Sequence, residues 1–188
     1  IGAAVNESCI AVPVSMNEES INDTWSALKL AKKPRLHVCA PTSAEQIEYI
    51  FHKKPDAMIN DIRDSVSRCA ALCPDVEFIA SDATRSEQDF LTLAIKTAID
   101  AGATTVTLCD TAGGMLPCEL ESFIALQYEK LPELKDVTLG VRCSDALSMA
   151  EACAVSAASS TSACVASGRP QRMLLETVLE KSSLFCIT

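Results

Sequence analysis

Short apolar runs alternate with longer stretches of helical periodicity along the whole chain. Each apolar run predicts a strand, and each stretch with apolar residues recurring every three to four positions predicts an amphipathic helix. The predicted strands cover residues 8–14, 34–40, 75–80, 104–110, 136–142 and 162–167. The predicted helices cover residues 17–31, 55–73, 86–102, 117–130, 145–158 and 171–181.

Residues that start or stop helices support several of these boundaries. Asn17 and Ser86 precede helical stretches and are predicted N-caps. Pro55 and Pro117 fit first helical turns, where the missing N–H of proline costs nothing. Gly102 follows a helical stretch and is predicted to end it.

Strands that alternate with helices predict right-handed crossovers and a parallel sheet, and apolar strands predict a sheet covered on both faces. A doubly wound dinucleotide-binding sheet would carry a G-x-G-x-x-G turn, and no predicted strand is followed by one. The pattern therefore favours an α/β fold of the (β/α)8 TIM-barrel type. About six of the eight units are present, and we expect the first two to be missing, with residues 1–188 forming one partial barrel domain.

Composition excludes several classes of function. The 188 residues carry a net charge of −9, and the 16 basic residues are scattered, so we expect no nucleic-acid binding. No apolar run approaches the roughly 20 residues of a membrane span, so we expect no membrane partner. The 10 cysteines form no C-x-x-C pair, and we expect them to be reduced core thiols of a cytoplasmic protein.

Polar residues gather where the predicted strands end, which is where (β/α) barrels keep functional groups. Thr42 and Ser43 either hydrogen-bond a carboxylate or phosphate or cap the next helix. Glu77 lies in an apolar strand and needs a partner, so it is either a site residue or a member of an ion pair. Asp82 and Arg85 follow that strand and can pair with each other.

The next two strand ends carry further candidates. Asp110 and Thr111 end a strand before Gly113, and they form either a ligand contact or an Asx-type turn. Arg142 and Ser144 form the polar end of the strand that follows.

Four segments resemble one family in consecutive order: RLHVCAPTSAEQIEY, DVEFIASDATRSEQDFL, AIDAGATTVTLCDTAGGMLPCEL and VTLGVRCSDALSMAEACAVSAA. They look like the 2-isopropylmalate synthase and homocitrate synthase family, metal-dependent Claisen-condensing TIM barrels related to hydroxymethylglutaryl-CoA lyases. The similarity covers roughly residues 17–165 and implies strands three to eight of the barrel. It also implies an acyltransferase ancestry in leucine biosynthesis, a dimer, a divalent metal and acetyl-CoA as co-substrate.

The chain departs from the family at the metal site. Where the family has H-x-H-N-D-x-G with two metal-binding histidines, this chain has Arg142 and Ser144 in their places. Guanidinium has no lone pair to donate, so we expect no metal and no cofactor here. Arg142 is a candidate carboxylate clamp instead.

Three hypotheses follow. The first is a degenerate relative, a pseudoenzyme that binds a small 2-keto acid or carboxylate without metal-dependent condensation. The second is an active acyl-CoA:2-keto acid acyltransferase, and the third is a structural or oligomerisation domain. We expect a homodimer, because an incomplete barrel has strand edges to cover. The catalytic residues stay unknown, and the predicted substrate-binding residues are Thr42, Glu77, Asp110, Thr111, Arg142 and Ser144.

Overall fold

Seven strands form one sheet whose strand order is the chain order, in a computed structural model that describes residues 5, 7–160, 164–169 and 172–177. The first six strands are parallel, and the seventh is antiparallel to the sixth. The strands are β1 (Ile10–Val14), β2 (Pro34–Pro41), β3 (Val76–Ser81), β4 (Thr105–Asp110), β5 (Thr138–Ser144), β6 (Cys164–Arg169) and β7 (Arg172–Thr177).

Five α-helices join these strands in the described residues. They are α1 (Glu18–Leu28), α2 (Pro55–Leu72), α3 (Gln88–Asp100), α4 (Pro117–Lys130) and α5 (Ala150–Ser160). Three short helical turns that the sequence analysis missed are η1 (Gln46–Ile50, a π-helix), η2 (Ala83–Arg85) and η3 (Pro132–Asp136). None of the described helices is both long and apolar enough to span a bilayer.

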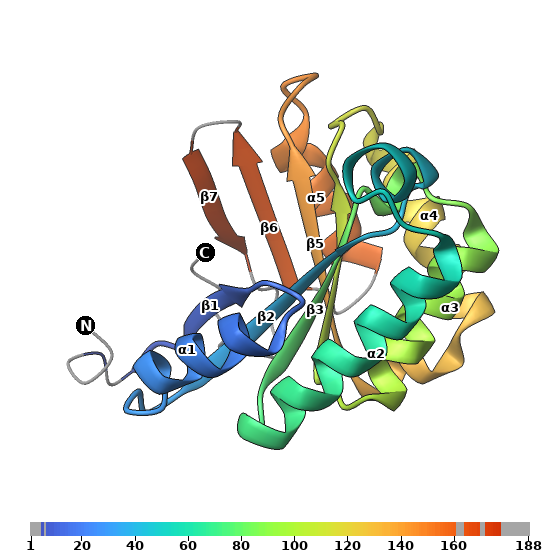
Figure 1. Cartoon of the computed structure of the whole chain (residues 1–188). Helices are drawn as coiled ribbons and strands as arrows, with labels where there is room; N and C mark the ends of the chain where they lie inside the picture. The colour runs from blue at the N-terminus through green and yellow to red at the C-terminus, as the bar shows by residue number, and fades with distance from the viewer. Residues whose placement is uncertain (1–4, 6, 161–163, 170–171, 178–188) are drawn as a thin grey trace.

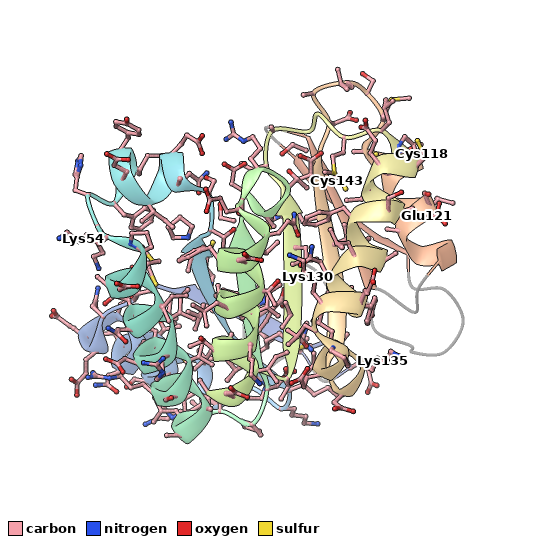
Figure 2. The ribbon with its side chains drawn as sticks, turned by 90° about the vertical axis from the view of Figure 1, so that its right-hand side faces the viewer. Lys54, Cys118, Glu121, Lys130, Lys135 and Cys143 are labelled. Carbon is pink, nitrogen blue, oxygen red and sulfur yellow. The ribbon has the colours of Figure 1, made fainter. Side chains whose placement is uncertain are left out.

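The sequential strand order identifies the type of α/β fold. Each right-handed crossover advances the sheet by one strand in one direction, so successive helices lie on the same face. A doubly wound sheet would reverse its strand order at a switch point and cover both faces. Figure 1 shows α2, α3 and α4 together on one side of the strands, and Figure 2 shows them side by side in front of the sheet. The prediction of a partial (β/α)8-type fold is confirmed.

The hydrophobic core lies between this helical layer and the sheet. Successive strand residues point to opposite faces, so every second residue of a strand enters the core. On β3, for example, Val76, Phe78 and Ala80 are fully buried in it. The alternate positions of β2 to β5 are mostly polar or thiol-bearing and make up what we call the polar face: Arg35, His37, Cys39, Glu77, Ile79, Thr105, Thr107, Cys109, Gly140 and Arg142.

Strands β3 and β4 are buried on both faces, as expected for a covered sheet, but one of the two faces is polar rather than apolar. Cys39 and Cys109 count as apolar in a hydropathy pattern, and with Ile79 they hid the two-residue alternation of the strands.

Two helix predictions are also wrong in part. Residues 172–177 of the predicted helix 171–181 form β7, because a short apolar run does not distinguish helix from strand without its partner. The predicted helix over 145–158 begins only at Ala150. Ser86 does not cap α3; its hydroxyl donates instead to Thr42 Oγ1, 2.7 Å away, and to the backbone oxygen of Asp82, 3.0 Å away.

The predicted cap at Asn17 is confirmed, since its Oδ1 accepts a hydrogen bond from the backbone N–H of Ser20 at 2.8 Å. We expect Asn17→Ala to lower the free energy of unfolding by about 1 kcal/mol in urea denaturation, because an N–H in the first turn of α1 loses its partner. The control is Asn22→Ala at an exposed position inside the same helix, which should be neutral or slightly stabilising. Equal losses in the two variants would contradict the capping role.

Candidate functional site

The first half of the polar face holds a buried ion-pair cluster centred on Glu77. Thr107 Oγ1 donates to Glu77 Oε1 at 2.6 Å, and Arg35 Nη1 donates to Glu77 Oε2 at 3.4 Å. His37 Nε2 lies 3.0 Å from Glu77 Oε2, in a direction that does not complete a hydrogen bond. Arg35, His37 and Glu77 are all almost fully buried. Glu77 therefore has the ion-pair partners that its buried position requires.

These partners keep Glu77 ionised. Burial alone would raise the pKa of its carboxyl, but His37, Thr107 and Arg35 together lower the pKa to about 2. Glu77 lies within a strand as predicted, but it is the second residue of β3, so its side chain is in the amino-terminal half of the strand and away from the carboxyl end. Its role as a substrate contact stays a prediction.

Gly140 makes room for this cluster. It is the register partner of Thr107, and a Cβ at Gly140 would collide with Thr107 Oγ1, the atom that hydrogen-bonds Glu77. The absence of a side chain on β5 at this point thus lets the Thr107 hydroxyl occupy the space above the strand.

At the carboxyl ends of β2, β3 and β4, hydrogen bonds link the loops into what we call the rim network: Thr42, Ser81, Asp82, Thr84, Arg85, Ser86, Asp110, Thr111, Gly113 and Met115. Thr42 Oγ1 donates to the backbone oxygen of Ser81 at 2.9 Å and accepts from Ser86. The Ser43 hydroxyl is fully buried and has no hydrogen-bond partner. Neither hydroxyl caps the following helical turn, since η1 has no side-chain cap.

Asp110 ties the β4–α4 loop to the rim network. Its buried carboxylate accepts hydrogen bonds from Thr84 Oγ1 at 2.9 Å and from the backbone N–H groups of Gly113 and Met115 at 3.1 and 3.2 Å. Thr111 Oγ1 accepts from the backbone N–H of Asp82 at 2.9 Å. Both side chains therefore have structural partners, as the Asx-turn alternative predicted, and their contact with a ligand stays a prediction.

The Asp82–Arg85 pair is confirmed. The guanidinium of Arg85 donates to both carboxylate oxygens of Asp82, at 2.8 and 2.6 Å. Asp82 has a left-handed backbone with φ of 61°, a conformation that aspartate tolerates better than most residues. The pair therefore holds a tight turn between β3 and α3.

Arg142 is the half-buried cationic end of the polar face. It is the register partner of Cys109 on β4. Burial raises the pKa of Cys109 to about 12, although the Arg142 charge opposes this shift. Burial by surrounding atoms also raises the pKa of Cys39, and the charge of Arg142 again opposes it. Cys39 and Cys109 are thus neutral thiols within the electrostatic reach of Arg142.

The donor chemistry at the end of β5 does not fit a divalent cation. Arg142 offers only N–H donors, and the hydroxyl of Ser144 is a weak ligand compared with imidazole. Across the described parts of the chain, no three His, Cys, Asp or Glu side chains are grouped so that they could hold a metal ion.

The structure brings the predicted residues together only in part. Thr42, Asp110 and Thr111 share the rim network, and the backbone of Ser144 packs against Gly113 in the same rim. Arg142 belongs to the polar face below the rim, where sequence reasoning missed Cys39 and Cys109. The signal that could have found these two thiols is their two-residue spacing from His37 and Thr107 on their strands.

Comparisons with known proteins agree with this architecture. A 2-isopropylmalate synthase from Rhodopirellula baltica is 38% identical over 135 residues, which are 72% of this chain and 26% of that protein. The 2-isopropylmalate synthase of Pelotomaculum thermopropionicum is 34% identical over 152 residues, 81% of this chain and 30% of that protein. The chain thus spans less than a third of the length of either relative.

The solved structure of an HMG-CoA lyase from Bacillus subtilis has a TM-score of 0.65 at 13% identity, over 87% of this chain and 57% of the lyase. At this identity the likeness supports the barrel-type fold alone. The family model described as HMGL-like matches residues 1–166. This match covers the sheet from β1 into β6 with its helical layer, and together with the synthase relatives it shows that the chain belongs to the HMGL-like family.

Proposed function

We propose that this chain is a degenerate 2-isopropylmalate synthase-like protein that binds a small 2-keto acid or carboxylate through Arg142, without metal-dependent condensation. The observation that carries the proposal is the position of Arg142. It stands on the polar face near the carboxyl end of β5, where the resemblance leads us to expect a metal-binding histidine.

The guanidinium supplies the positive charge that a carboxylate needs. Its planar N–H donors match the two oxygens of a carboxylate and form charge-assisted hydrogen bonds, about twice as strong as neutral ones. The half-buried position of Arg142 strengthens this attraction, because water screens it less than on an open surface.

The same substitution removes what a Claisen condensation requires. In the family the metal acts as a Lewis acid that polarises the keto group, which contributes several kcal/mol of transition-state stabilisation. A guanidinium neither coordinates the keto oxygen nor tolerates a cation beside it. A difference of about 1.4 kcal/mol changes a rate tenfold, so losing this stabilisation is expected to lower the rate of condensation by several orders of magnitude.

The test measures binding and turnover with 3-methyl-2-oxobutanoate, a branched 2-keto acid. We expect it to raise the melting temperature of the protein, with a stabilisation of about 2.7 kcal/mol at 100 times Kd. We expect no release of coenzyme A from acetyl-CoA when Mn²⁺ or Zn²⁺ is added. Arg142→Gln should abolish the melting shift, because the carboxylate loses its charged partner.

The matched control is Arg63→Gln on the exposed side of α2, which should keep the full melting shift. An unchanged shift in Arg142→Gln would overturn the proposed role of Arg142. Metal-dependent release of coenzyme A would overturn the proposal that condensation is lost, and would restore the acyltransferase hypothesis.

A further inference from the structure

We propose that the cavity between α1 and α2 binds a small primary alkylammonium ion, such as the protonated form of isobutylamine. The residues that line this cavity belong to α1, α2 and the residues just before α1, and none of them belongs to the polar face or the rim network. This site therefore does not depend on the proposed function, and its test uses a different ligand and different variants.

One side of α2 and the first turn of α1 line the cavity, which has a volume of about 210 Å³. Asp61, Asp64, Ser65 and Arg68 line it from α2, at the i, i+3, i+4 and i+7 positions that share one side of a helix. The two helices are neighbours in Figure 1, and an ion pair between Arg68 and Glu18 joins them. One water molecule needs only roughly 15 Å³ of such volume, so the cavity has room for a small organic ligand.

The hydroxyl of Ser65 is the observation that points to a ligand. Ser65 is only 4% exposed, lines the cavity and forms no side-chain hydrogen bond with any residue that the structure describes. Hydroxyls inside helices often donate to the backbone oxygen four residues earlier, as Thr92, Thr97 and Ser122 do in this chain. A buried hydroxyl without a partner destabilises a fold, and a polar ligand in the cavity would supply that partner.

The charges around the cavity favour a cation, since three carboxylates and one guanidinium line it. The guanidinium of Arg68 is neutralised by Glu18, whose Oε2 lies 2.5 Å from Nη1. Asp61 accepts a hydrogen bond from the primary ammonium of Lys53, which is not part of the cavity lining. Asp64 has no ion-pair partner among the described residues, so its negative charge beside Ser65 is uncompensated.

Two other classes of ligand fit this cavity less well. An anion at the amino-terminal end of α1 would meet Glu18 and Glu19, and Asn17 already caps the first turn. A metal ion needs grouped ligands, and within the described ranges no three His, Cys, Asp or Glu side chains are arranged to hold one. An organic cation needs no such grouping, because each of its N–H groups binds a separate acceptor.

A primary ammonium matches the acceptors of the cavity. Its three N–H donors pair with the carboxylate of Asp64, the hydroxyl of Ser65 and either Asp61 or water. Met16 and Ile21 supply apolar surface in the same cavity for a short alkyl group. Aliphatic amines are protonated at neutral pH, as the side chain of lysine is.

Amide chemical shifts, measured by NMR on the full chain during a titration with isobutylamine, test the site near neutral pH and at constant ionic strength. We expect the backbone amide signals of Asp64 and Ser65 to shift in a saturable way. Isobutanol has the same carbon skeleton without the charge, and tetramethylammonium has the charge without N–H donors. Both should bind at least about 10-fold more weakly than isobutylamine.

Two variants separate ligand binding from structure. Asp64→Asn keeps the shape but removes the charge, and it should weaken isobutylamine binding about 10-fold. Ser65→Ala removes one neutral hydrogen bond to the ligand and should weaken binding about fivefold. The free energy of unfolding of Ser65→Ala should not fall in urea denaturation, because no hydrogen bond within the chain is lost and alanine favours a helix. The matched control is Asp23→Asn, which removes an exposed carboxylate of α1 outside the cavity and should leave binding unchanged.

Absence of a saturable shift up to about 100 mM isobutylamine would overturn the proposed site. Equal binding of tetramethylammonium would show attraction by charge alone and would refute the role of the N–H donors. A loss of stability in Ser65→Ala as large as that of a broken buried hydrogen bond would show that its hydroxyl already has a partner, and would refute its assignment to the ligand. None of these results changes the expected effect of Arg142→Gln on keto-acid binding, so the two proposals fail separately.

Discussion

Replacing Glu77 by glutamine is expected to lower the free energy of unfolding by about 3 kcal/mol. Glutamine keeps the shape of the side chain and can still accept the hydrogen bond of Thr107, but it removes the carboxylate charge that lies next to both Arg35 and His37. Arg35 keeps its bond to Asp75, at 2.9 Å, and loses its bond to the carboxylate of Glu77. Removing a carboxylate partner from a buried guanidinium destabilises the fold, because water does not reach the buried site to replace that partner.

Equilibrium urea denaturation measures this loss. The matched control is Glu133→Gln, which removes an exposed carboxylate that also pairs with a basic side chain, Lys96, at 3.2 Å. Exposed pairs of this kind contribute at most about 1 kcal/mol. If the two variants lost the same small free energy, the buried cluster would not stabilise the sheet in the way that its geometry indicates.

The same carboxyl predicts a dependence of stability on pH. The pKa of Glu77 falls from an ordinary 4.5 to about 2 in the folded chain, because His37, Thr107 and Arg35 outweigh its burial. A lowered pKa stabilises the fold above pH 4.5, and this contribution is lost as the pH falls toward 2. The stability difference between the parent chain and Glu77→Gln should therefore shrink over that window, and a constant difference would contradict it.

The second large effect is expected for Gly113→Ala, a loss of about 3 kcal/mol in the free energy of unfolding. Gly113 has φ of 64°, and a Cβ there would lie 2.5 Å from the backbone oxygen of Ser144 and 2.8 Å from its backbone carbon. Both are atoms of β5, so no rotamer change relieves the collision. The β4–α4 loop must move away from the strand, and the two hydrogen bonds that Asp110 accepts from this loop are disturbed.

Gly114→Ala is the matched control at the adjacent position. Its Cβ would meet no heavy atom within 4 Å, and its backbone is outside the left-handed region. We expect a change within about 0.5 kcal/mol in the same denaturation experiment. Because Ser144 follows Arg142 by two residues, Gly113→Ala should also weaken binding of 3-methyl-2-oxobutanoate, whereas Gly114→Ala should not. Equal stability of the two variants would contradict the close approach of the loop to β5.

The sequence by itself determined the class of fold and the family. The alternation of strands and helices is a local pattern, and N-cap Asn17, first-turn Pro55 and Pro117 and the terminating Gly102 act within a few residues of their own helix. Local signals of this kind can be recognised without knowing which strands pair. The motif segments added the family, which the match over residues 1–166 confirms.

Only the tertiary structure decided how the candidate residues are used. Whether Glu77 binds a ligand or an ion-pair partner depends on Arg35 and His37, about 40 positions earlier on a neighbouring strand. Thr42 and Asp110 are polar strand-end residues in the sequence, but the structure commits their oxygens to the rim network. Propensity describes one residue at a time, whereas these roles depend on pairs joined by strand register.

Pairing between strands also explains two features that the sequence patterns misplaced: the last strand of the sheet and the two cysteines of the polar face. Residues 172–177 became β7 because β6 offered an edge for antiparallel pairing, which overrides the local helical spacing. The hydropathy pattern predicts Cys39 and Cys109 as core thiols, yet register sets both on the polar face, opposite the apolar side chains of their strands, with Cys109 as the partner of Arg142. Hydropathy gives a residue's affinity for water, and only the folded sheet decides which of its two faces that residue occupies.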